Sequence, residues 1–245
     1  MRTFTKSALF SAALLALAGT AQAQKAGDTI LGVGIAQIVP SVALGTLTTT
    51  GPSAPQNAAF NTATAGASSS IDSTTTLTVS LLRMFTDNIG AELTLGVPPK
   101  LTMNLNAPNG GGASNSHPGA ATATYLAPAV VAKYLFNKPG EQWRPYVGLG
   151  ATYVSFADVK ANTSDALVNN LAGGSAALSS AWAPVYNLGV IYNIDARWSI
   201  NASVSYIPLK TTATFTGASG GTGTTTSGSV DLNTTDYVIR VGYKF

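Results

Sequence analysis

Cysteine is absent from this chain of 245 residues, and histidine occurs once, at His117. Without cysteine, neither disulfide bonds nor thiolate chemistry can contribute to the protein. With a single histidine as well, zinc sites and nucleophilic triads are not expected. We therefore expect no enzymatic activity, no cofactor and no bound metal, and we expect His117 to be a solvated loop residue. A membrane-embedded enzyme that hydrolyses or transfers acyl chains is the alternative.

Charge is also sparse, with 13 Lys or Arg residues and 10 Asp or Glu residues. Soluble surfaces usually carry more charge, so this composition fits a soluble enzyme poorly. Past the N-terminal segment no apolar run approaches 18 residues, which excludes membrane-spanning helices. The formal net charge is +3, of which Arg2 and Lys6 contribute two charges. Such a small excess does not suggest a nucleic-acid partner.

The N-terminal segment has the three parts of a secretory signal peptide. Arg2 and Lys6 form a basic region, residues 8–17 are a short apolar run, and Ala21-Gln22-Ala23 is a small-x-small cleavage site. We expect residues 1–23 to be a cleaved signal peptide and residues 24–245 to be a single barrel domain. A buried N-terminal helix is the alternative.

The last nine residues alternate between apolar and polar side chains. Tyr237, Ile239, Val241, Tyr243 and Phe245 fall on one face of an extended strand, and two cations fall on the other. The apolar face ends in aromatic residues, which is typical of a strand between lipid and a polar lumen. A closing strand of a soluble β-sandwich is the alternative.

Seven further segments alternate in the same way, at 29–36, 76–81, 91–97, 129–136, 146–153, 186–192 and 198–206. Short turns at 85–89, 137–142 and 193–197 alternate with long Gly/Ser/Thr/Asn/Ala-rich connections at 41–71, 104–121, 160–181 and 214–230. Lipid cannot satisfy unpaired backbone groups, so such a sheet must close. The pattern predicts an all-β, eight-stranded antiparallel transmembrane β-barrel with short periplasmic turns and long extracellular loops.

Three ionisable residues, Glu92, Lys133 and Arg240, have the inward parity of their strands. A charge inside a narrow barrel must be paired or hydrated. We expect a lumenal ion-pair network that acts as a polar plug in the periplasmic half. A charged permeation filter is the alternative.

The opposite strand ends are rich in proline and in large apolar residues. Proline cannot donate to a β-ladder, so several prolines at one level suggest interrupted pairing below the loops. Inward apolar side chains there would line a pocket, or a lateral opening, for a small hydrophobic molecule. The candidates are Pro98, Leu101, Met103, Leu126, Pro128, Phe156, Trp182, Ile207 and Leu209. Strand termination and loop packing would explain the same residues.

Several motifs resemble the OmpW/AlkL family of outer-membrane proteins: Arg144-Pro-Tyr-Val-Gly-Leu-Gly-Ala-Thr-Tyr153, Phe85-Thr-Asp-Asn-Ile-Gly-Ala-Glu92, Leu126-Ala-Pro128, Trp182-Ala-Pro184, Arg197-Trp-Ser-Ile-Asn201 and Val241-Gly-Tyr-Lys-Phe245. The resemblance implies an eight-stranded barrel in the outer membrane of a Gram-negative cell. It also implies passive uptake of small hydrophobic molecules, through an external pocket and a lateral exit into the bilayer. The segments 41–71 and 98–104 depart from the family pattern, so no family gate residue is carried over.

The expected partners are therefore outer-membrane lipid, small hydrophobic molecules and the barrel-assembly machinery, which would take the C-terminal Phe245. A second function class stays open. In that alternative the protein is a surface interaction, adhesion or receptor protein, whose long loops bind a partner while the barrel only anchors them.

Overall fold

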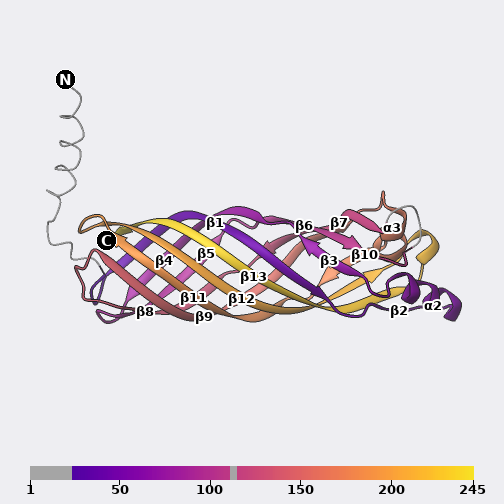
Figure 1. Cartoon of the computed structure of the whole chain (residues 1–245), viewed down its shortest axis with the longest axis horizontal. Coiled ribbons are helices and arrows are strands. Elements are labelled where there is room, and N and C mark those ends of the chain that lie inside the picture. The colour runs from indigo at the N-terminus through magenta and orange to yellow at the C-terminus, as the bar shows by residue number, and fades with distance from the viewer. Residues whose placement is uncertain (1–23, 111–114) are drawn as a thin grey trace, which may run out of the picture.

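The computed structural model describes residues 24–110 and 115–245 of the chain. The predicted signal peptide, residues 1–23, lies outside the described residues. The described chain is an elongated tube of tilted strands, with the C-terminus at one end and the helices and shortest strands at the other (Figure 1). The end that holds the C-terminus is called the short-turn end below, and the end that holds the helices and the shortest strands is called the long-loop end.

Eight strands form a closed antiparallel ring. In ring order they are β1 (Thr29–Leu44), β4 (Thr74–Met84), β5 (Ile89–Gly96), β8 (Ala129–Leu135), β9 (Trp143–Ala161), β11 (Ala181–Asn193), β12 (Trp198–Thr216) and β13 (Thr225–Lys244). The ring closes where β13 pairs with β1, from Ile30↔Lys244 to Leu44↔Val230. Each predicted strand overlaps one of these, so the predicted eight-stranded barrel is confirmed.

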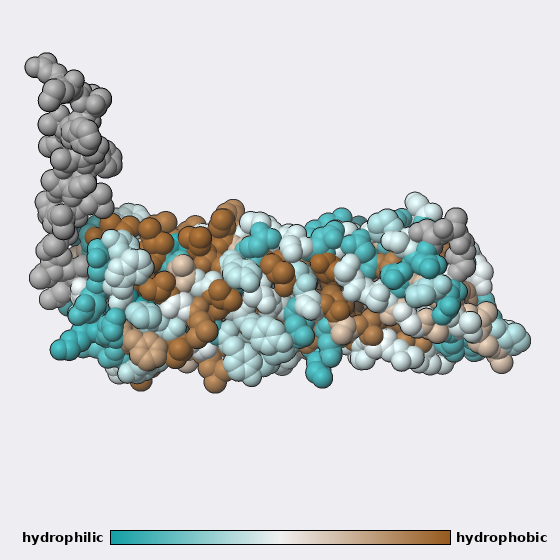
Figure 2. Space-filling model, in the orientation of Figure 1, coloured by the Kyte–Doolittle hydropathy of each residue, from teal (hydrophilic) through white to brown (hydrophobic). Residues whose placement is uncertain are grey.

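The sorting of side chains follows from the two-residue period of a strand. Along β1, Val33 and Ile35 are 52% and 51% exposed, whereas Ala36, which points to the opposite face of the strand, is 4% exposed. The same alternation on the other strands covers the short-turn half of the tube with apolar side chains (Figure 2). Closure leaves no unpaired edge along this half, which is the condition for a sheet in lipid.

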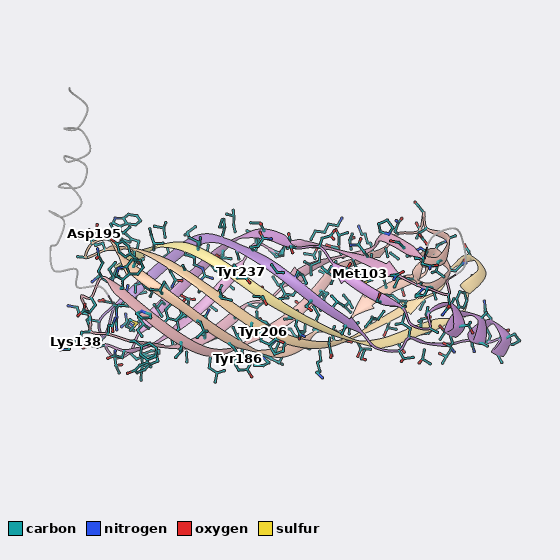
Figure 3. The ribbon with its side chains drawn as sticks, viewed as in Figure 1. Met103, Lys138, Tyr186, Asp195, Tyr206 and Tyr237 are labelled. Atoms are coloured by element: carbon teal, nitrogen blue, oxygen red, sulfur yellow. The ribbon has the colours of Figure 1, made fainter. Side chains whose placement is uncertain are left out.

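Aromatic residues form two girdles, one at each boundary of this apolar band. The first lies at the short-turn end and contains Tyr134, Phe136, Trp143, Tyr192, Trp198, Tyr243 and Phe245. The second lies near the middle of the tube, where Figure 3 labels three of its members; it contains Tyr153, Trp182, Tyr186, Tyr206 and Tyr237. Aromatic girdles at both interfaces are typical of an outer-membrane barrel.

The strands continue well beyond the second girdle. β9 and β12 have 19 residues each and β13 has 20. Roughly 10 residues suffice to cross a bilayer, so about half of each long strand lies outside the lipid.

The long connections are folded onto these extensions. They contain β2 (Thr48–Thr50), α2 (Ala54–Ala63), β3 (Ser68–Ile71), β6 (Lys100–Asn106), β7 (Ser116–Leu126), α3 (Ala166–Ala172), β10 (Ser175–Leu178) and η1 (Ser219–Gly221). β7 pairs with β9, β6 pairs with β7, and β3 pairs with β6. The predicted long loops therefore build a second, smaller sheet region above the barrel, because their Ser, Thr and Ala residues also tolerate extended structure.

The short turns are closed by local hydrogen bonds. The amide of Phe85 donates to the carbonyl of Ile89 over 2.8 Å, and Ile194 donates to Trp198 over 2.9 Å. Asp195 Oδ1 accepts the amides of Arg197 and Trp198, each over 2.7 Å. None of the helices in 24–110 and 115–245 has the length and apolarity needed to span a bilayer.

Candidate functional site

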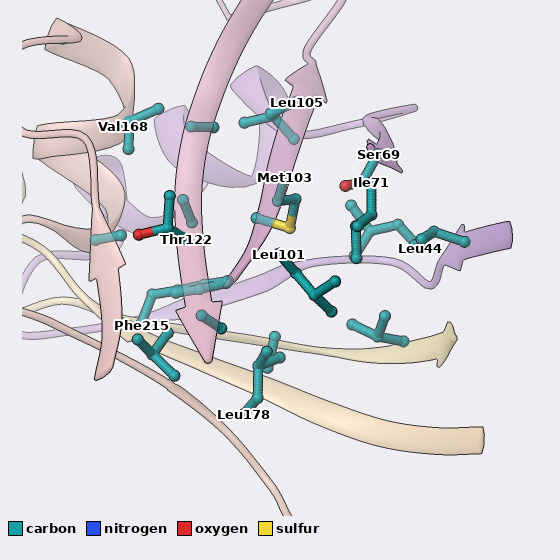
Figure 4. Close-up of a pocket in the computed structure, with 18 of the residues that line it drawn as sticks. Leu44, Ser69, Ile71, Leu101, Met103, Leu105, Thr122, Val168, Leu178 and Phe215 are labelled. Carbon is teal, nitrogen blue, oxygen red and sulfur yellow. The ribbon is translucent and has the colours of Figure 1, made fainter. Parts of the chain in front are cut away.

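A cavity lined almost entirely by apolar side chains lies inside the long-loop end. It encloses about 1020 Å³ of empty space, including open solvent at its mouth. Leu101 and Met103 reach it from β6, Ile71 from β3, and Leu178 and Phe215 from β10 and β12 (Figure 4). The few polar residues in its lining include Ser69, Thr122 and Thr226. This space is called the apolar cavity below, and its apolar lining suits a hydrophobic guest.

Helix α3 covers one side of the apolar cavity with Val168, Leu171 and Ala172. Asp165 caps the helix, since its Oδ1 accepts the amide of Val168 over 3.0 Å. Its Oδ2 lies 2.7 Å from His117 Nδ1 on β7. Burial by itself would raise the pKa of Asp165, but the hydrogen bonds from His117 and Val168 outweigh it, and the pKa is lowered.

His117 is therefore not the solvated loop residue that we predicted. It lies in β7, is 7% exposed, and ties that strand to the start of α3. The Gly-rich neighbourhood in the sequence suggested a loop, but β7 pairs there with β6 through Leu105↔His117.

A second volume, called the mid-barrel chamber below, lies inside the ring at the level of the wall between β5 and β8. It encloses about 860 Å³, again including open solvent. Its lining combines apolar residues such as Ile38, Val185 and Ile207 with polar ones such as Asn187, Ser205 and Asp236. The chamber is therefore amphipathic, unlike the apolar cavity.

A packed layer separates the two volumes, and it is called the septum below. It consists of Leu101, Tyr125, Val154 and Leu209, which are 4%, 4%, 0% and 1% exposed and belong to one buried cluster. Leu101 also lines the apolar cavity, and Tyr125 lines the chamber. Val154 and Leu209 belong to the same cluster and line neither volume.

The wall of the barrel is interrupted beside the chamber. The pairing of β5 with β8 ends at Thr94↔Ala129, and pairing resumes where Tyr125 donates to the carbonyl of Pro99 over 2.9 Å. Pro98, Pro99 and Pro128 occupy this break and have no amide proton to donate. Along it, Leu95, Val97 and Leu126 are 51%, 58% and 44% exposed, and all three also line the chamber.

Three charged residues form the floor of the chamber on its short-turn side. Lys133 Nζ lies 2.8 Å and Arg240 Nη1 lies 3.3 Å from Glu92 Oε1. Thr94 donates to the same carboxylate over 3.3 Å, and Arg240 Nε donates to Thr78 Oγ1 over 3.1 Å. The ion-pair network expected from their parity is present, and we call Glu92, Lys133 and Arg240 the polar floor.

Below the polar floor the lumen holds a small pocket of about 320 Å³, open solvent included, and is otherwise packed. A cluster of buried side chains comes first, formed by Ile30, Leu82, Met84, Leu135, Tyr146 and Ile191. Arg144, which is 0% exposed, then donates to the carbonyls of Gln24, Phe136 and Asp87. Gln24 in turn donates to Asn193 over 2.6 Å. These hydrogen bonds around Arg144 close the short-turn end of the lumen. They were not predicted from the sequence, although an arginine beside a short turn could have indicated them.

Eight of the nine predicted pocket residues separate into four groups. Leu101, Met103 and Phe156 line the apolar cavity, and Leu126, Pro128 and Ile207 line the chamber. Leu209 belongs to the septum. Pro98 is exposed at the wall break.

Trp182 does not line either volume. It is 72% exposed and lies beside Tyr153, with ring centroids 5.2 Å apart. β11 begins at Ala181, so Trp182 has the outward parity of Tyr186 and Leu188. Its placement in the pocket is corrected: it belongs to the second aromatic girdle.

Chemistry-bearing side chains do not converge in the described residues. No group of three or more His, Asp or Glu residues there is placed to hold a metal ion. Residues 217–221 spell Gly-x-Ser-x-Gly, but Ser219 lies in η1 and its hydroxyl accepts a hydrogen bond from Asn169. His117 contacts Asp165 and not this serine.

Comparison with known proteins agrees with this architecture. The chain is 29% identical to outer membrane protein W of Vibrio cholerae over 91% of each sequence. It is 31% identical to outer membrane protein AlkL of Ectopseudomonas oleovorans over 60% of this chain and 57% of that protein. The crystal structure of OprG from Pseudomonas aeruginosa superposes with a TM-score of 0.75 and 25% identity, covering 91% of this chain and 98% of that one.

The solution structure of Escherichia coli outer membrane protein W gives a TM-score of 0.54 at 25% identity, covering 90% of this chain and 99% of that one. The family model of OmpW matches residues 25–245. With eight strands closed into a ring and an apolar band between two aromatic girdles, the chain is an outer-membrane β-barrel that belongs to the OmpW family.

Proposed function

We propose that the protein admits small hydrophobic molecules passively across the outer membrane. The solute enters the apolar cavity from the external side, crosses the septum into the mid-barrel chamber, and leaves sideways between β5 and β8 into the bilayer. The observation that carries this proposal is the placement of Leu126, which lines the chamber and is also 44% exposed at the break in the wall.

Partition supplies the driving force. A solute with roughly 200 Å² of apolar surface gains about 5 kcal/mol when it leaves water. The apolar cavity offers such a solute an apolar environment outside the lipid, past the polar surface of the outer leaflet. Both the cavity and the bilayer interior are apolar, so the transfer is downhill and requires no energy source.

The closed short-turn end supports a sideways exit. The polar floor and the packed side chains below it oppose an apolar solute on its way down the lumen, because solvation of the buried charges would be lost. The break between β5 and β8 beside the chamber opposes the solute less. The pairing of β5 with β8 ends at Thr94, so no backbone hydrogen bonds between residues 95–97 and β8 have to be broken. In this proposal the polar floor acts as the polar plug predicted from the sequence, which blocks passage along the lumen towards the short-turn end.

Site-directed thiol labelling tests the exit, because the chain has no cysteine of its own. In the Leu126→Cys variant, a charged methanethiosulfonate reagent places a charge at the wall break. We expect labelling before reconstitution to lower hydrophobic uptake at least about tenfold, given the penalty for an apolar solute passing a charge.

The matched control is Leu188→Cys, whose side chain is 62% exposed on β11, away from the chamber lining. Labelling there adds the same charge to the lipid-facing surface and should leave uptake unchanged. Equal rates for labelled and unlabelled Leu126→Cys would exclude the lateral exit.

A surface interaction role is the second candidate, and helix α2 is the observation that favours it. None of the residues of α2 (Ala54–Ala63) is buried, so the helix is presented at the tip of the long-loop end (Figure 1). Deletion of residues 52–66 should abolish attachment to a partner cell surface while uptake persists. Normal attachment by the deletion variant would remove this alternative.

We also propose that Phe245, which is 74% exposed, is presented to the barrel-assembly machinery. Its amide donates to the carbonyl of Thr29 over 3.0 Å at the end of the seam between β13 and β1, and its ring packs against that of Tyr243, with centroids 5.2 Å apart. Phe245→Ala should reduce the amount of folded barrel in the outer membrane without changing its stability once folded. An unchanged amount of folded barrel would count against this role.

A further inference from the structure

The mid-barrel chamber contains a carboxylate that the proposed uptake of apolar solutes does not use. Asp236 has the inward parity of β13 and lines the chamber. Its Oδ1 is buried and receives no hydrogen bond from the described residues. None of the ion pairs formed by the described residues includes it.

A buried polar atom without a partner is uncommon in folded proteins, and each one calls for an explanation. Thr234, two residues earlier on the same face of β13, is 1% exposed and does not line the chamber. The carboxylate of Asp236 is therefore the acceptor that this part of β13 offers to the chamber.

The cations of the polar floor do not neutralise Asp236. Arg240 lies four residues further along β13, which places its backbone about 13 Å from that of Asp236. Its guanidinium is already engaged by Glu92 and Thr78. The floor carries two cations and one carboxylate, so the chamber is positive at its short-turn side and negative at Asp236.

From this arrangement we propose that the mid-barrel chamber binds the hydrogen-bond-donating head of a small amphiphile, a hydroxyl or an ammonium group, at Asp236. The proposal rests on the uptake route described above and names a substrate class for it: short aliphatic alcohols and amines, in addition to plain hydrocarbons.

The remaining lining fits the tail of such a molecule. Ile38, Val185 and Ile207 are 5%, 2% and 5% exposed and line the same chamber as Asp236. Towards the wall break the lining continues with Leu95, Val97 and Leu126. A head held at Asp236 leaves an aliphatic tail among these side chains, whereas the excess positive charge of the floor disfavours an ammonium group at that end.

The test compares three probes of equal chain length: n-octane, 1-octanol and n-octylammonium. Initial uptake rates are measured in cells that express the full-length barrel, after subtraction of the rate in cells without it. Asp236→Leu should lower barrel-dependent uptake of octanol and octylammonium about tenfold, as expected for a lost hydrogen bond to a charged group, and should leave octane within about twofold.

Asp236→Asn separates the two heads and preserves the shape of the side chain. Its amide oxygen still accepts from a hydroxyl, so octanol uptake should stay within about threefold, while octylammonium uptake falls about tenfold with the lost charge. The matched control is Asp231→Leu, on the same strand but outside the chamber lining, where Asp231 pairs with Lys210 at 3.9 Å. It should change none of the three rates.

Folding of each variant is checked from the electrophoretic mobility of the unheated barrel. Removal of an unpaired buried carboxylate should not weaken the fold. An equal fall for all three probes, or unchanged rates for all three in Asp236→Leu, would overturn the proposal; if the leucine variant does not fold, the asparagine variant decides in the same way. If the native barrel fails to accelerate octane but octylammonium uptake still depends on Asp236, the head-group site stands and the proposed hydrophobic uptake fails.

Discussion

Lys133 Nζ lies 2.8 Å from Glu92 Oε1 inside the barrel, and the two residues are 2% and 5% exposed. The ammonium group also lies 4.2 Å from the centre of the Tyr146 ring, which adds a cation–π contact. The pair joins β5 and β8 directly below the point where the wall between these two strands is interrupted. It therefore holds β5 and β8 together on the short-turn side of the wall break.

We predict that Lys133→Met destabilises the folded barrel by about 3 kcal/mol, because removal of one partner leaves a buried charge less well compensated. The double variant Glu92→Gln/Lys133→Met should be no more stable than the single variant, because it leaves Arg240 buried without its carboxylate partner. Urea unfolding in lipid, followed by tryptophan fluorescence, measures both changes. A loss below about 0.5 kcal/mol for the single variant would show that Arg240 alone balances Glu92.

The polar floor is also predicted to block ion flow. Planar-bilayer recordings of the native barrel should show almost no conductance, because the buried cluster and the hydrogen bonds of Arg144 beneath the floor leave only a small pocket there. Replacing Glu92 and Lys133 with Ala should raise conductance, since the side chains that hold the floor together are lost. A native channel whose cation selectivity reverses in Glu92→Lys would instead indicate a charged permeation filter.

Leu209→Ala is predicted to open the septum. Leu209 is 1% exposed, so its truncation should leave a cavity and destabilise the barrel by about 2–5 kcal/mol. If displacement of the septum limits passage, hydrophobic uptake per folded barrel should rise. Leu188→Ala, a truncation of the same size on the lipid-facing surface, is the control and should leave the uptake rate unchanged.

Trp182→Ser should have little effect on hydrophobic uptake, in contrast to Leu101→Ser. Trp182 belongs to the aromatic girdle, whereas Leu101 lines the apolar cavity and the septum. Quenching by brominated lipids measures the first half of this prediction directly: it should be strong for Trp182 in a variant that lacks the other two tryptophans. Loss of uptake in Trp182→Ser at normal folded levels would return this residue to the pocket.

Asp165→Asn should loosen helix α3 at neutral pH but not at acidic pH. The pKa of Asp165 is lower in the folded protein than in the unfolded chain, where it is about 4. The stabilising contribution of Asp165 is therefore fully present at a pH above the unfolded-state pKa and is lost as the pH falls through the folded-state pKa. Hydrogen exchange of the Val168 amide, corrected for intrinsic rates, follows the helix. A difference between native and variant proteins that persists well below pH 4 would show that the contribution of Asp165 does not depend on its charge.

Much of the barrel was predictable because the alternation of apolar and polar residues can be read within each strand by itself. Tyr237, Ile239 and Val241 are outward because strand side chains alternate, and a sheet in lipid has to close whatever its neighbours are. The same parity argument placed Glu92, Lys133 and Arg240 inside, and their ion pairs followed from the need to compensate buried charge.

The long-loop end was not predictable in the same way. His117 and Asp165 are 48 residues apart in sequence, and their contact depends on the pairing of β7 with β6 and β9. Trp182 was assigned to the pocket with the other large apolar residues at these strand ends, although it has the outward parity of Tyr186 and Leu188. In a strand the parity, and not the size or apolarity of the side chain, decides which face it occupies.

The sequence alone determined a closed barrel, its apolar band, its charged lumen and its turns, since each depends on two-residue periodicity and on the intolerance of lipid for unpaired backbone groups. Only the tertiary structure decided that the apolar cavity and the mid-barrel chamber are distinct volumes, and that Asp236 lines the chamber with a buried oxygen that receives no hydrogen bond from the described residues. These features depend on how strands distant in sequence meet around a tube, and side-chain volume and register, not local pattern, govern that meeting.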